Sequence, residues 1–361
     1  MTILLFVLGL AFLIIGAEML VHGASKLASG LGISPLIIGL TVIAFGTSAP
    51  ELAVSIGGAI SGQADIVLGN VVGSNIFNVL FILGISAIIV PLFVSQQIIR
   101  FDVPLMIIVS GVVLFLSLDQ MITRFDGFLL VAGLILYVVI LVIFSLRANS
   151  GNKEPGQKIQ TTQPSGDPVN WLLNIFLVII GLALLVLGSR WFVSGAVSFA
   201  GYLGVSELII GLTIVAAGTS MPEVVTSIIA AIRGERDIAV GNVVGSNIFN
   251  LLGVLGISSM LAPSGISVSE PILAFDIPLM IAVAIACLPV FFTRGAISRW
   301  EGFLFLCYYI AYTSYLILNA TQHSLLTIFN TVMLYFAIPI TAVTLIIIVF
   351  REFKNRSKKA I

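Results

Sequence analysis

Two glutamates stand within long apolar segments of the chain, and each one ends the same short motif. Glu51 closes the string GTSAPE, and Glu223 closes GTSMPE. A carboxylate at the centre of a bilayer costs about 2.5–3.5 kcal/mol on an insertion scale, and an unpaired buried carboxylate contributes nothing to packing. Two such residues at equivalent places therefore indicate a binding site.

Polar side chains recur around both glutamates at intervals of four residues. The decapeptide GNVVGSNIFN occupies residues 69–78 and again, unchanged, residues 241–250, a shift of 172 positions. Residues four apart share one face of a helix, so these polar positions form stripes. The stripes are Thr47, Glu51 and Ser55; Thr219, Glu223 and Ser227; Asn70, Ser74 and Asn78; and Asn242, Ser246 and Asn250.

A proline precedes each glutamate inside an apolar helix. Proline removes the hydrogen bond to the carbonyl four residues earlier, so residues 44–47 and 216–219 are predicted to turn backbone oxygens toward a cavity. Together with carboxylate, hydroxyl and amide oxygens, these carbonyls form a set of hard donors. Such a set suits Ca²⁺ or Na⁺ and not Zn²⁺ or Cu⁺. The histidines and cysteines show no metal-ligand spacing and are interpreted as structural; they are His22, His323, Cys287 and Cys307.

Part of this polar set has an ordinary structural alternative. Ser, Thr and Asn often serve only as hydrogen-bonding contacts between membrane helices, and glycines allow helices to approach closely. For Asn70 and Asn242, packing and ion binding both stay open. The glycines of the decapeptide are interpreted as packing positions; they are Gly69, Gly73, Gly241 and Gly245.

Composition places the chain in a membrane. Of its 361 residues, 59% are hydrophobic and 9% are charged, whereas soluble domains carry about a quarter charged residues. Its formal net charge of zero argues against nucleic acid as a partner. Apolar runs of about 20 residues, long enough to cross the hydrocarbon core, predict an all-α polytopic bundle in the lipid bilayer. The eleven expected spans are 2–28, 35–60, 67–92, 102–118, 126–146, 170–200, 206–232, 238–262, 276–293, 300–319 and 325–350.

The two halves of the chain resemble each other. LIIGLTVIAFGTSAPE matches LIIGLTIVAAGTSMPE, and FDVPLM matches FDIPLM. Five spans in the first copy are an odd number, so the second copy starts from the opposite side of the membrane. The copies are therefore predicted to be inverted five-helix repeats, as in many secondary transporters. The predicted units are 1–146 (first repeat), 147–169 (cytoplasmic linker loop), 170–320 (second repeat) and 325–361 (an extra transmembrane helix with a basic cytoplasmic tail).

Charge predicts the orientation of these spans. With the N-terminus outside, 14 of the 16 Lys and Arg residues lie on the cytoplasmic side, as the positive-inside rule requires. Only Arg124 then lies outside, and Arg190 lies within a span. The expected arrangement is N-out and C-in, in the plasma or inner membrane of a cell. Glu18 and Arg190 correspond under the repeat shift. They are expected either to pair with each other or to face water near the helix ends, and a structural ion pair is favoured over a transport role.

The doubled GTS-x-PE and GNVVGSNIFN motifs resemble the two alpha-repeats of the cation/Ca²⁺ exchanger superfamily, in particular its Na⁺/Ca²⁺ exchanger branch. The resemblance covers roughly residues 1–320. It implies a ten-helix transporter in which paired glutamates bind Ca²⁺ and Na⁺ competes at overlapping and flanking sites. The residues it implicates are Glu51, Glu223, Thr47 and Thr219 for Ca²⁺; Ser48, Ser220, Ser74, Ser246 and the carbonyls of Ala44 and Ala216 for Na⁺; and Asn78 and Asn250 as the central pair.

The same resemblance implies a transport mechanism without a cofactor and without enzyme chemistry. K⁺-dependent exchangers carry Asp at the position of Asn250, so this chain resembles the K⁺-independent type. The resemblance also implies exchange of three Na⁺ for one Ca²⁺ by alternating access. With only Glu51 and Glu223 ionised, the empty site is costly to occlude, which predicts obligatory exchange. A Ca²⁺/H⁺ antiporter using the same glutamates stays open, as does a passive cation channel. The oligomeric state is not predicted.

Overall fold

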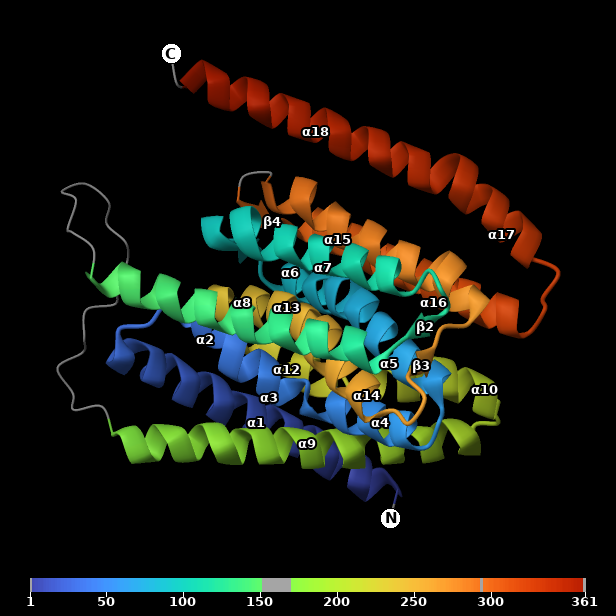
Figure 1. Ribbon diagram of the computed structural model, residues 1–361, viewed down its shortest axis with the longest axis horizontal. Coiled ribbons are helices and arrows are strands. Elements are labelled where there is room, and N and C mark those ends of the chain that lie inside the picture. Colours follow the sequence, from blue (N-terminus) through green and yellow to red (C-terminus); the bar gives the residue numbers. More distant parts are fainter. Residues whose placement is uncertain (1, 151–169, 293–294, 360–361) are drawn as a thin grey trace.

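The computed structural model describes residues 2–150, 170–292 and 295–359, and helices dominate it (Figure 1). The central part of the predicted linker, residues 151–169, lies outside the described residues. The structure also contains two short antiparallel β-ribbons, which the all-helical prediction did not include. The helical class itself is confirmed.

Each half of the chain runs through the same order of elements, in which η marks a π-helical segment. The first half contains α1 (Thr2–Leu31), α2 (Pro35–Ile38), η1 (Gly39–Ile43), α3 (Ala44–Thr47), α4 (Ala49–Ile60), α5 (Ala64–Phe77), η2 (Asn78–Leu83), α6 (Gly84–Ile89), β1 (Leu92–Phe93), η3 (Ile98–Asp102), α7 (Val103–Leu116), β2 (Met121–Ile122) and α8 (Arg124–Ser150). The second half contains α9 (Trp171–Tyr202), α10 (Glu207–Ile210), η4 (Gly211–Val215), α11 (Ala216–Gly218), α12 (Met221–Ile232), α13 (Arg236–Phe249), η5 (Asn250–Val254), α14 (Leu255–Leu261), β3 (Ile266–Ser267), η6 (Ile272–Asp276), α15 (Ile277–Phe292), β4 (Ala296–Ile297) and α16 (Arg299–Ala320). The chain then continues into α17 (Leu326–Val332), η7 (Met333–Ala337) and α18 (Ile338–Lys359).

The ribbons join one half to the other. β1 pairs with β4, with Leu92 opposite Ile297, and β2 pairs with β3, with Ile122 opposite Ile266. All four of these apolar side chains are buried. Because β1 and β3 are counterparts, as are β2 and β4, the two ribbons are the same contact made twice.

Most of the predicted spans coincide with helices. Among the described residues, nine helices are long and apolar enough to cross a membrane, and the bent pair Pro35–Thr47 and Ala49–Ile60 is a tenth candidate. The predicted seventh span, 206–232, is broken into short pieces, of which Met221–Ile232 is the longest. The chain is thus a multi-pass helical membrane protein, while the count of eleven spans stays a prediction.

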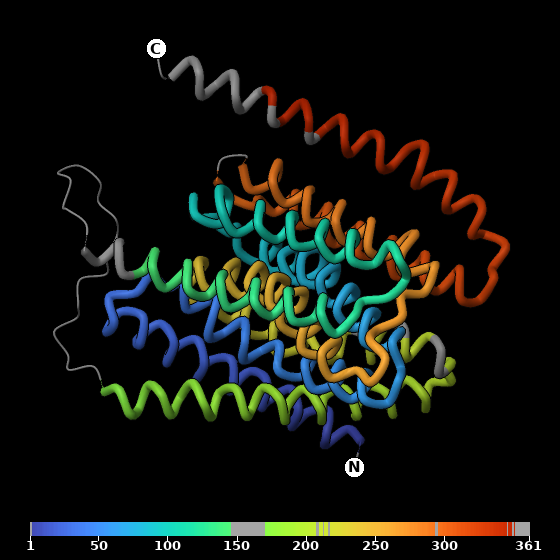
Figure 2. Tube along the Cα trace, in the orientation of Figure 1, coloured from blue at the N-terminus to red at the C-terminus, as the bar shows by residue number. Residues whose placement is uncertain are grey.

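The two helices that carry the repeated decapeptide form the core of the bundle. Ala64–Ile89 and Arg236–Leu261 are the most deeply buried of the candidate spans. In α13, all residues from Ile238 to Phe249 are buried. Figure 2 shows helices of both halves interleaved around this centre. The polar side chains of the decapeptides therefore face protein rather than lipid.

Helices α1 and α9 pack closely along each other at one edge of the bundle (Figure 1). A Cβ added at Gly16 would lie 2.8 Å from the carbonyl oxygen of Gly181, and one added at Gly181 would lie 2.8 Å from that of Gly16. Gly9 and Gly188 meet in the same reciprocal way. The obstructing atoms are backbone atoms, so only glycine permits this approach. We therefore treat α1 and α9 as one two-helix unit.

The expected Glu18–Arg190 ion pair is wrong. The Nη2 atom of Arg233 lies 2.6 Å from Oε2 of Glu18, and Nε of Arg233 donates to the same carboxylate. Close by, the Ser25 hydroxyl donates to Glu235 over 2.5 Å. Arg190 is exposed on α9. The correspondence between the two repeats did not predict this ion pair, because the arginine that pairs with Glu18 lies at the end of α12 and not on α9.

The glycines of the decapeptides divide into two groups. A Cβ at Gly245 would lie 2.7 Å from the carbonyl oxygen of Leu40, and one at Gly241 would lie 3.1 Å from that of Leu36. The predicted packing role is confirmed for these two. Gly69 is exposed, and among the described residues no atom lies within 4 Å of a Cβ added at Gly69 or Gly73.

We predict that Gly181→Val separates α1 from α9 and lowers the free energy of unfolding by about 1–3 kcal/mol, the usual cost of overpacking. Thermal unfolding of the purified protein in detergent measures this loss. Gly111→Val is the matched control, because among the described residues no atom lies within 4 Å of a Cβ at Gly111. Equal unfolding midpoints for the two variants would contradict the close packing of α1 on α9.

Candidate ion-binding site

Both glutamates lie where a helix is interrupted. Helices α3 and α4 meet at Ser48 with a bend of 45°, and α11 and α12 are separated by Thr219 and Ser220. A proline in the first turn of α4 and of α12 prevents continuous helical hydrogen bonding. Glu51 and Glu223 occupy these first turns, where the helix dipole stabilises negative charge.

Each glutamate receives a hydrogen bond from the opposite half of the chain. The Ser220 hydroxyl donates to Oε1 of Glu51 over 2.7 Å, and the Ser48 hydroxyl donates to Oε1 of Glu223 over 2.9 Å. All four residues are 0% exposed. Because each serine stands at the break of its own helix, the interruption in one repeat supplies the donor for the carboxylate of the other.

The side chains of Asn70 and Asn242 are occupied by hydrogen bonds. Asn70 accepts from the Thr219 hydroxyl at 3.3 Å and donates to the carbonyl oxygen of Glu51 at 3.0 Å. Asn242 accepts from the Thr47 hydroxyl at 3.1 Å and donates to the hydroxyl of Ser227. The sequence left both packing and ion binding open for these two asparagines. Their contacts favour a structural role, in which they hold neighbouring polar residues in place, over direct ion binding.

A group of buried oxygens has no hydrogen-bond donor among the described residues. Five of these oxygens belong to predicted site residues: Glu51 Oε2, Glu223 Oε2, Asn78 Oδ1, Asn250 Oδ1 and Ser246 Oγ. The others are the hydroxyl oxygens of Ser86, Thr226 and Ser258. An unsatisfied buried acceptor costs about 1–3 kcal/mol, and more if it is charged. A cation would satisfy carboxylate and carbonyl oxygens together. The arrangement therefore has the chemistry of a cation-binding site built from both repeats.

Two of the remaining predicted residues, Ser74 and Ala44, have hydrogen-bond partners of their own. The Ser74 hydroxyl oxygen is 3.2 Å from that of Ser220. The Ala44 carbonyl accepts from the Ser48 amide at 3.1 Å and from the Thr47 hydroxyl at 3.4 Å, so the break does not leave it without a donor. Ala216 begins α11, and its side chain lies outside the described residues.

Sequence reasoning missed several buried polar residues. Asn75 and Asn247, inside the decapeptides, meet across the two halves. Asp102 is fully buried and accepts from the Tyr137 hydroxyl at 3.0 Å, and Asp276 accepts from Tyr312 at 3.1 Å. The signal for the aspartates was the repeated FD-x-PLM string. Each aspartate has its own phenol donor, and among the described residues no group of three or more His, Cys, Asp or Glu side chains could share a metal ion.

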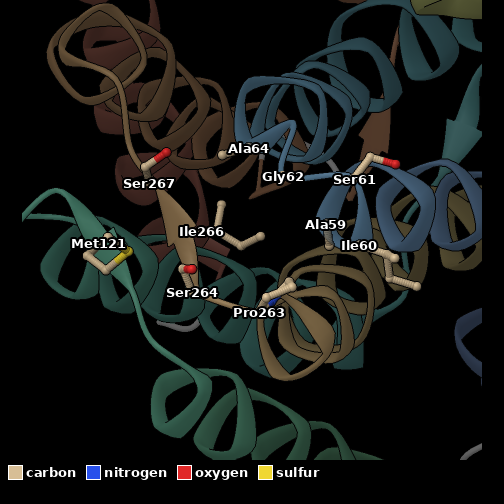
Figure 3. A pocket seen from close by; sticks show the side chains of 11 residues that line it. Ala59, Ile60, Ser61, Gly62, Ala64, Met121, Pro263, Ser264, Ile266 and Ser267 are labelled. Atoms are coloured by element: carbon tan, nitrogen blue, oxygen red, sulfur yellow. The ribbon is translucent and has the colours of Figure 1, made fainter.

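A pocket of about 360 Å³ opens beyond the end of α4 (Figure 3). Ala59 and Ile60 line it from α4, and the segment from Pro263 to Ser267 lines it from the other half. Glu51 is about two helical turns away, or roughly 12 Å along α4. None of the described residues that line the pocket is a carboxylate, so the pocket is separate from the candidate cation site.

The chain is similar to known membrane transport proteins along most of its length. The family profile described as "Sodium/calcium exchanger protein" matches residues 1–143 and 173–318. The chain is 40% identical over 307 residues to a putative antiporter, CaxA, of Alkalimonas amylolytica, covering 84% of this chain and 95% of that protein. It is 35% identical over 339 residues to the sodium/calcium exchanger MaX1 of Methanosarcina acetivorans, covering 86% and 96%. The structure of the sodium-calcium exchanger NCX_Mj soaked with 2.5 mM Na⁺ and 0.1 mM Ca²⁺ superposes with a TM-score of 0.72 at 29% identity, covering 86% and 96%.

We predict that Ser220→Ala lowers the unfolding midpoint of the cation-free protein, because it leaves Glu51 Oε1 buried without its donor. The expected cost is about 1–3 kcal/mol. Added Ca²⁺ should narrow the gap to wild type, since a bound cation satisfies the carboxylate instead. Thermal unfolding in chelator and in millimolar Ca²⁺ measures both effects.

The control for this prediction is Ser86→Ala. Ser86 is also buried, but its hydroxyl has no hydrogen-bond partner among the described residues. Its loss should leave the midpoint unchanged in either condition. A Ser220→Ala protein as stable as Ser86→Ala in chelator would contradict the described contact.

Proposed function

Because the chain belongs to the sodium/calcium exchanger protein family, we propose that it exchanges Na⁺ for Ca²⁺ across a membrane by alternating access. The family is one of secondary transporters and not of enzymes. The observation that carries the proposal is the group of buried oxygens without donors, which two glutamates and two asparagines contribute from opposite halves. The membrane is proposed to be the plasma or inner membrane of the cell.

The charge of the site fits these two ions. With Glu51 and Glu223 ionised, the empty site carries about two negative charges, which one Ca²⁺ neutralises. Three Na⁺ would leave one positive charge. An empty, doubly negative site is costly to occlude in a medium of low dielectric constant. The carrier is therefore expected to change sides only when loaded, so that one ion enters as the other leaves.

We assign roles to the site residues by their positions in the two repeats. Glu51 and Glu223, with Thr47 and Thr219, are proposed for Ca²⁺. Na⁺ is proposed to use the shared carboxylates and the flanking oxygens of Ser48, Ser220, Ser74, Ser246, Ala44 and Ala216. Asn78 and Asn250 are proposed as the neutral central pair, which makes K⁺ unnecessary.

An asymmetry in the packing supports alternating access. Both helices of the unit contact α12, α1 more extensively than α9, but among the described residues neither makes a comparable contact with α4. Ala53 and Gly57 on α4 are exposed, whereas their counterparts Val225 and Ile229 on α12 are partly covered. Movement of the unit from α12 to α4 would reverse which side of the site is covered.

The proposed orientation follows from the distribution of Lys and Arg along the chain. We keep the N-out, C-in arrangement with eleven spans, with the repeats and the linker bounded as predicted. Arg124, the single basic residue expected outside, is compatible with it. Its guanidinium donates to the carbonyls of Ala262 and Pro263 at the end of α14, so a local structural role explains its position.

We predict that Ca²⁺ uptake into Na⁺-loaded vesicles collapses in Glu51→Gln and in Glu223→Gln, because each change removes half of the charge that Ca²⁺ neutralises. Uptake of radioactive Ca²⁺ by the purified protein in liposomes measures this. Asp65→Asn is the matched control, since it removes one carboxylate from an exposed position of α5. Uptake that survives both glutamate changes would reject the site.

Separate gradients in the same vesicles distinguish the coupling ions. An outward Na⁺ gradient should drive uptake without K⁺. A proton gradient that drives uptake as well, without Na⁺, would indicate the alternative Ca²⁺/H⁺ antiporter, in which each glutamate takes a proton. Uptake down the Ca²⁺ gradient with no counter-ion would indicate a channel.

We also predict that membrane potential changes the rate of exchange. Three Na⁺ leaving for one Ca²⁺ entering moves one positive charge outward, which a potential drives by about 2.3 kcal/mol per 100 mV. An inside-positive potential, set with valinomycin and K⁺, should therefore accelerate Ca²⁺ uptake, and an inside-negative potential should slow it. A rate that does not respond to potential would indicate electroneutral exchange instead.

A further inference from the structure

Four asparagines meet where the two decapeptide helices cross. They are Asn75 and Asn78 at the end of the first decapeptide, and Asn247 and Asn250 at the end of the second. None is more than 2% exposed. The two outer members, Asn78 and Asn250, each begin a π-helical segment, and their carbonyl oxygens belong to the group without donors.

An asparagine side chain can bind a cation in only one orientation of its amide group. Its side-chain amide ends in a carbonyl oxygen, which attracts a cation, and in an NH₂ group, which repels it. Rotation of the amide by half a turn exchanges the two with almost no change in shape. A site that uses Asn78 and Asn250 as ligands therefore needs something to hold their amides in the correct orientation.

The hydrogen bonds of Asn75 set the orientation of Asn250. The Nδ2 group of Asn75 donates to the backbone carbonyl of Asn247 at 3.4 Å. A backbone carbonyl can only accept, so this contact requires the NH₂ end of Asn75. Its Oδ1 is then left to accept from Nδ2 of Asn250 at 3.3 Å. Asn250 must use its NH₂ group here, which turns its own Oδ1 away from Asn75.

Asn247 acts on Asn78 in the same way. Its Nδ2 group donates to the backbone carbonyl of Asn75 at 3.3 Å, and its Oδ1 accepts from Nδ2 of Asn78 at 3.0 Å. In both cases the asparagine of one repeat orients the amide of the other. The backbone carbonyls of Asn75 and Asn247 fix the orientation of all four amides, because a carbonyl can only accept a hydrogen bond.

We propose that Asn75 and Asn247 are positioning residues that hold the amides of Asn250 and Asn78 with their carbonyl oxygens toward the bound cation. This rests on the proposed function, because it assumes that the buried oxygens are ion ligands. Asn75 and Asn247 do not themselves touch the ion. Their loss would free the neighbouring amides to rotate, and the NH₂ groups would then compete with the oxygens for the site.

The test compares Asn247→Leu with Asn247→Asp. Leucine has the shape of asparagine but neither donates nor accepts. Aspartate still accepts from Asn78 and so preserves its orientation, although it loses the donor to the carbonyl of Asn75. We expect Asn247→Leu to raise the KM for Ca²⁺ about tenfold, equivalent to roughly 1.4 kcal/mol, with a smaller change in maximal rate. Asn247→Asp should not raise it. Equal damage by both changes would show a purely structural role and overturn the proposal.

A double-mutant cycle shows whether Asn247 acts through Asn78. Coupled residues give non-additive effects, so Asn247→Leu should raise the KM by less than about twofold when Asn78→Leu is already present. Full additivity would contradict the proposal. Met106→Leu is the control, because it preserves the bulk beside Asn247 and removes only the weak sulfur acceptor of its Nδ2 group at 3.5 Å, while the Asn75 carbonyl still accepts from that group. Its KM should stay within about twofold of wild type.

A second measurement separates this proposal from the proposed function. The rise of the unfolding midpoint with Ca²⁺ reports ion binding without transport. Wild-type protein that binds Ca²⁺ but does not exchange it for Na⁺ would reject the proposed function alone. Ca²⁺-dependent stabilisation that is as large in Asn247→Leu as in wild type would reject the positioning role alone.

Discussion

The structure depends on two carboxylates that are completely buried in an apolar helical bundle. Glu51 and Glu223 are both 0% exposed, and no Lys or Arg side chain among the described residues forms an ion pair with either. Other features of the centre reduce the cost of this burial. The helix breaks place each glutamate at the positive end of a helix dipole, and a serine donates to one oxygen of each carboxylate. The second oxygen of each is left without a donor. That incomplete satisfaction is the observation that supports the proposed cation site.

The two halves of the chain complete each other at this centre. Ser48 donates to Glu223 and Ser220 to Glu51, and the ribbons on both sides of the site also pair across halves. A single repeat would leave its glutamate without a hydroxyl donor and its Asn75 or Asn247 without the partner carbonyl. Such a site cannot form in either half alone, which is a physical reason for both copies to keep the same decapeptide.

The pairing of the halves is symmetric at the centre but not at the edge. Helices α1 and α9 are held together by glycines and pack together on α12, whereas the face of α4 that carries Ala53 and Gly57 is exposed. The ion pair of Glu18 with Arg233 joins α1 to the α12 side, and its counterpart positions, Arg190 and Ser61, have no such contact among the described residues. Symmetric contacts at the centre and asymmetric packing around it fit the proposed carrier, whose site opens to each side in turn. Among the described residues, the extra helix α18 contacts η7 and α15.

The sequence by itself determined the features that depend on local composition and spacing. Apolar length predicted most of the spans, the repeated strings predicted matching halves, and the cost of a carboxylate in an apolar segment identified Glu51 and Glu223. The tertiary structure decided the contacts between distant residues. Arg233, not Arg190, pairs with Glu18; Asn75 and Asn247 meet at the centre; and Asp102 is buried beside Tyr137. Periodicity shows which face of a helix is polar but not which other face meets it. Those partners depend on how helices far apart in the chain pack, because burial and hydrogen bonding are properties of the assembled bundle.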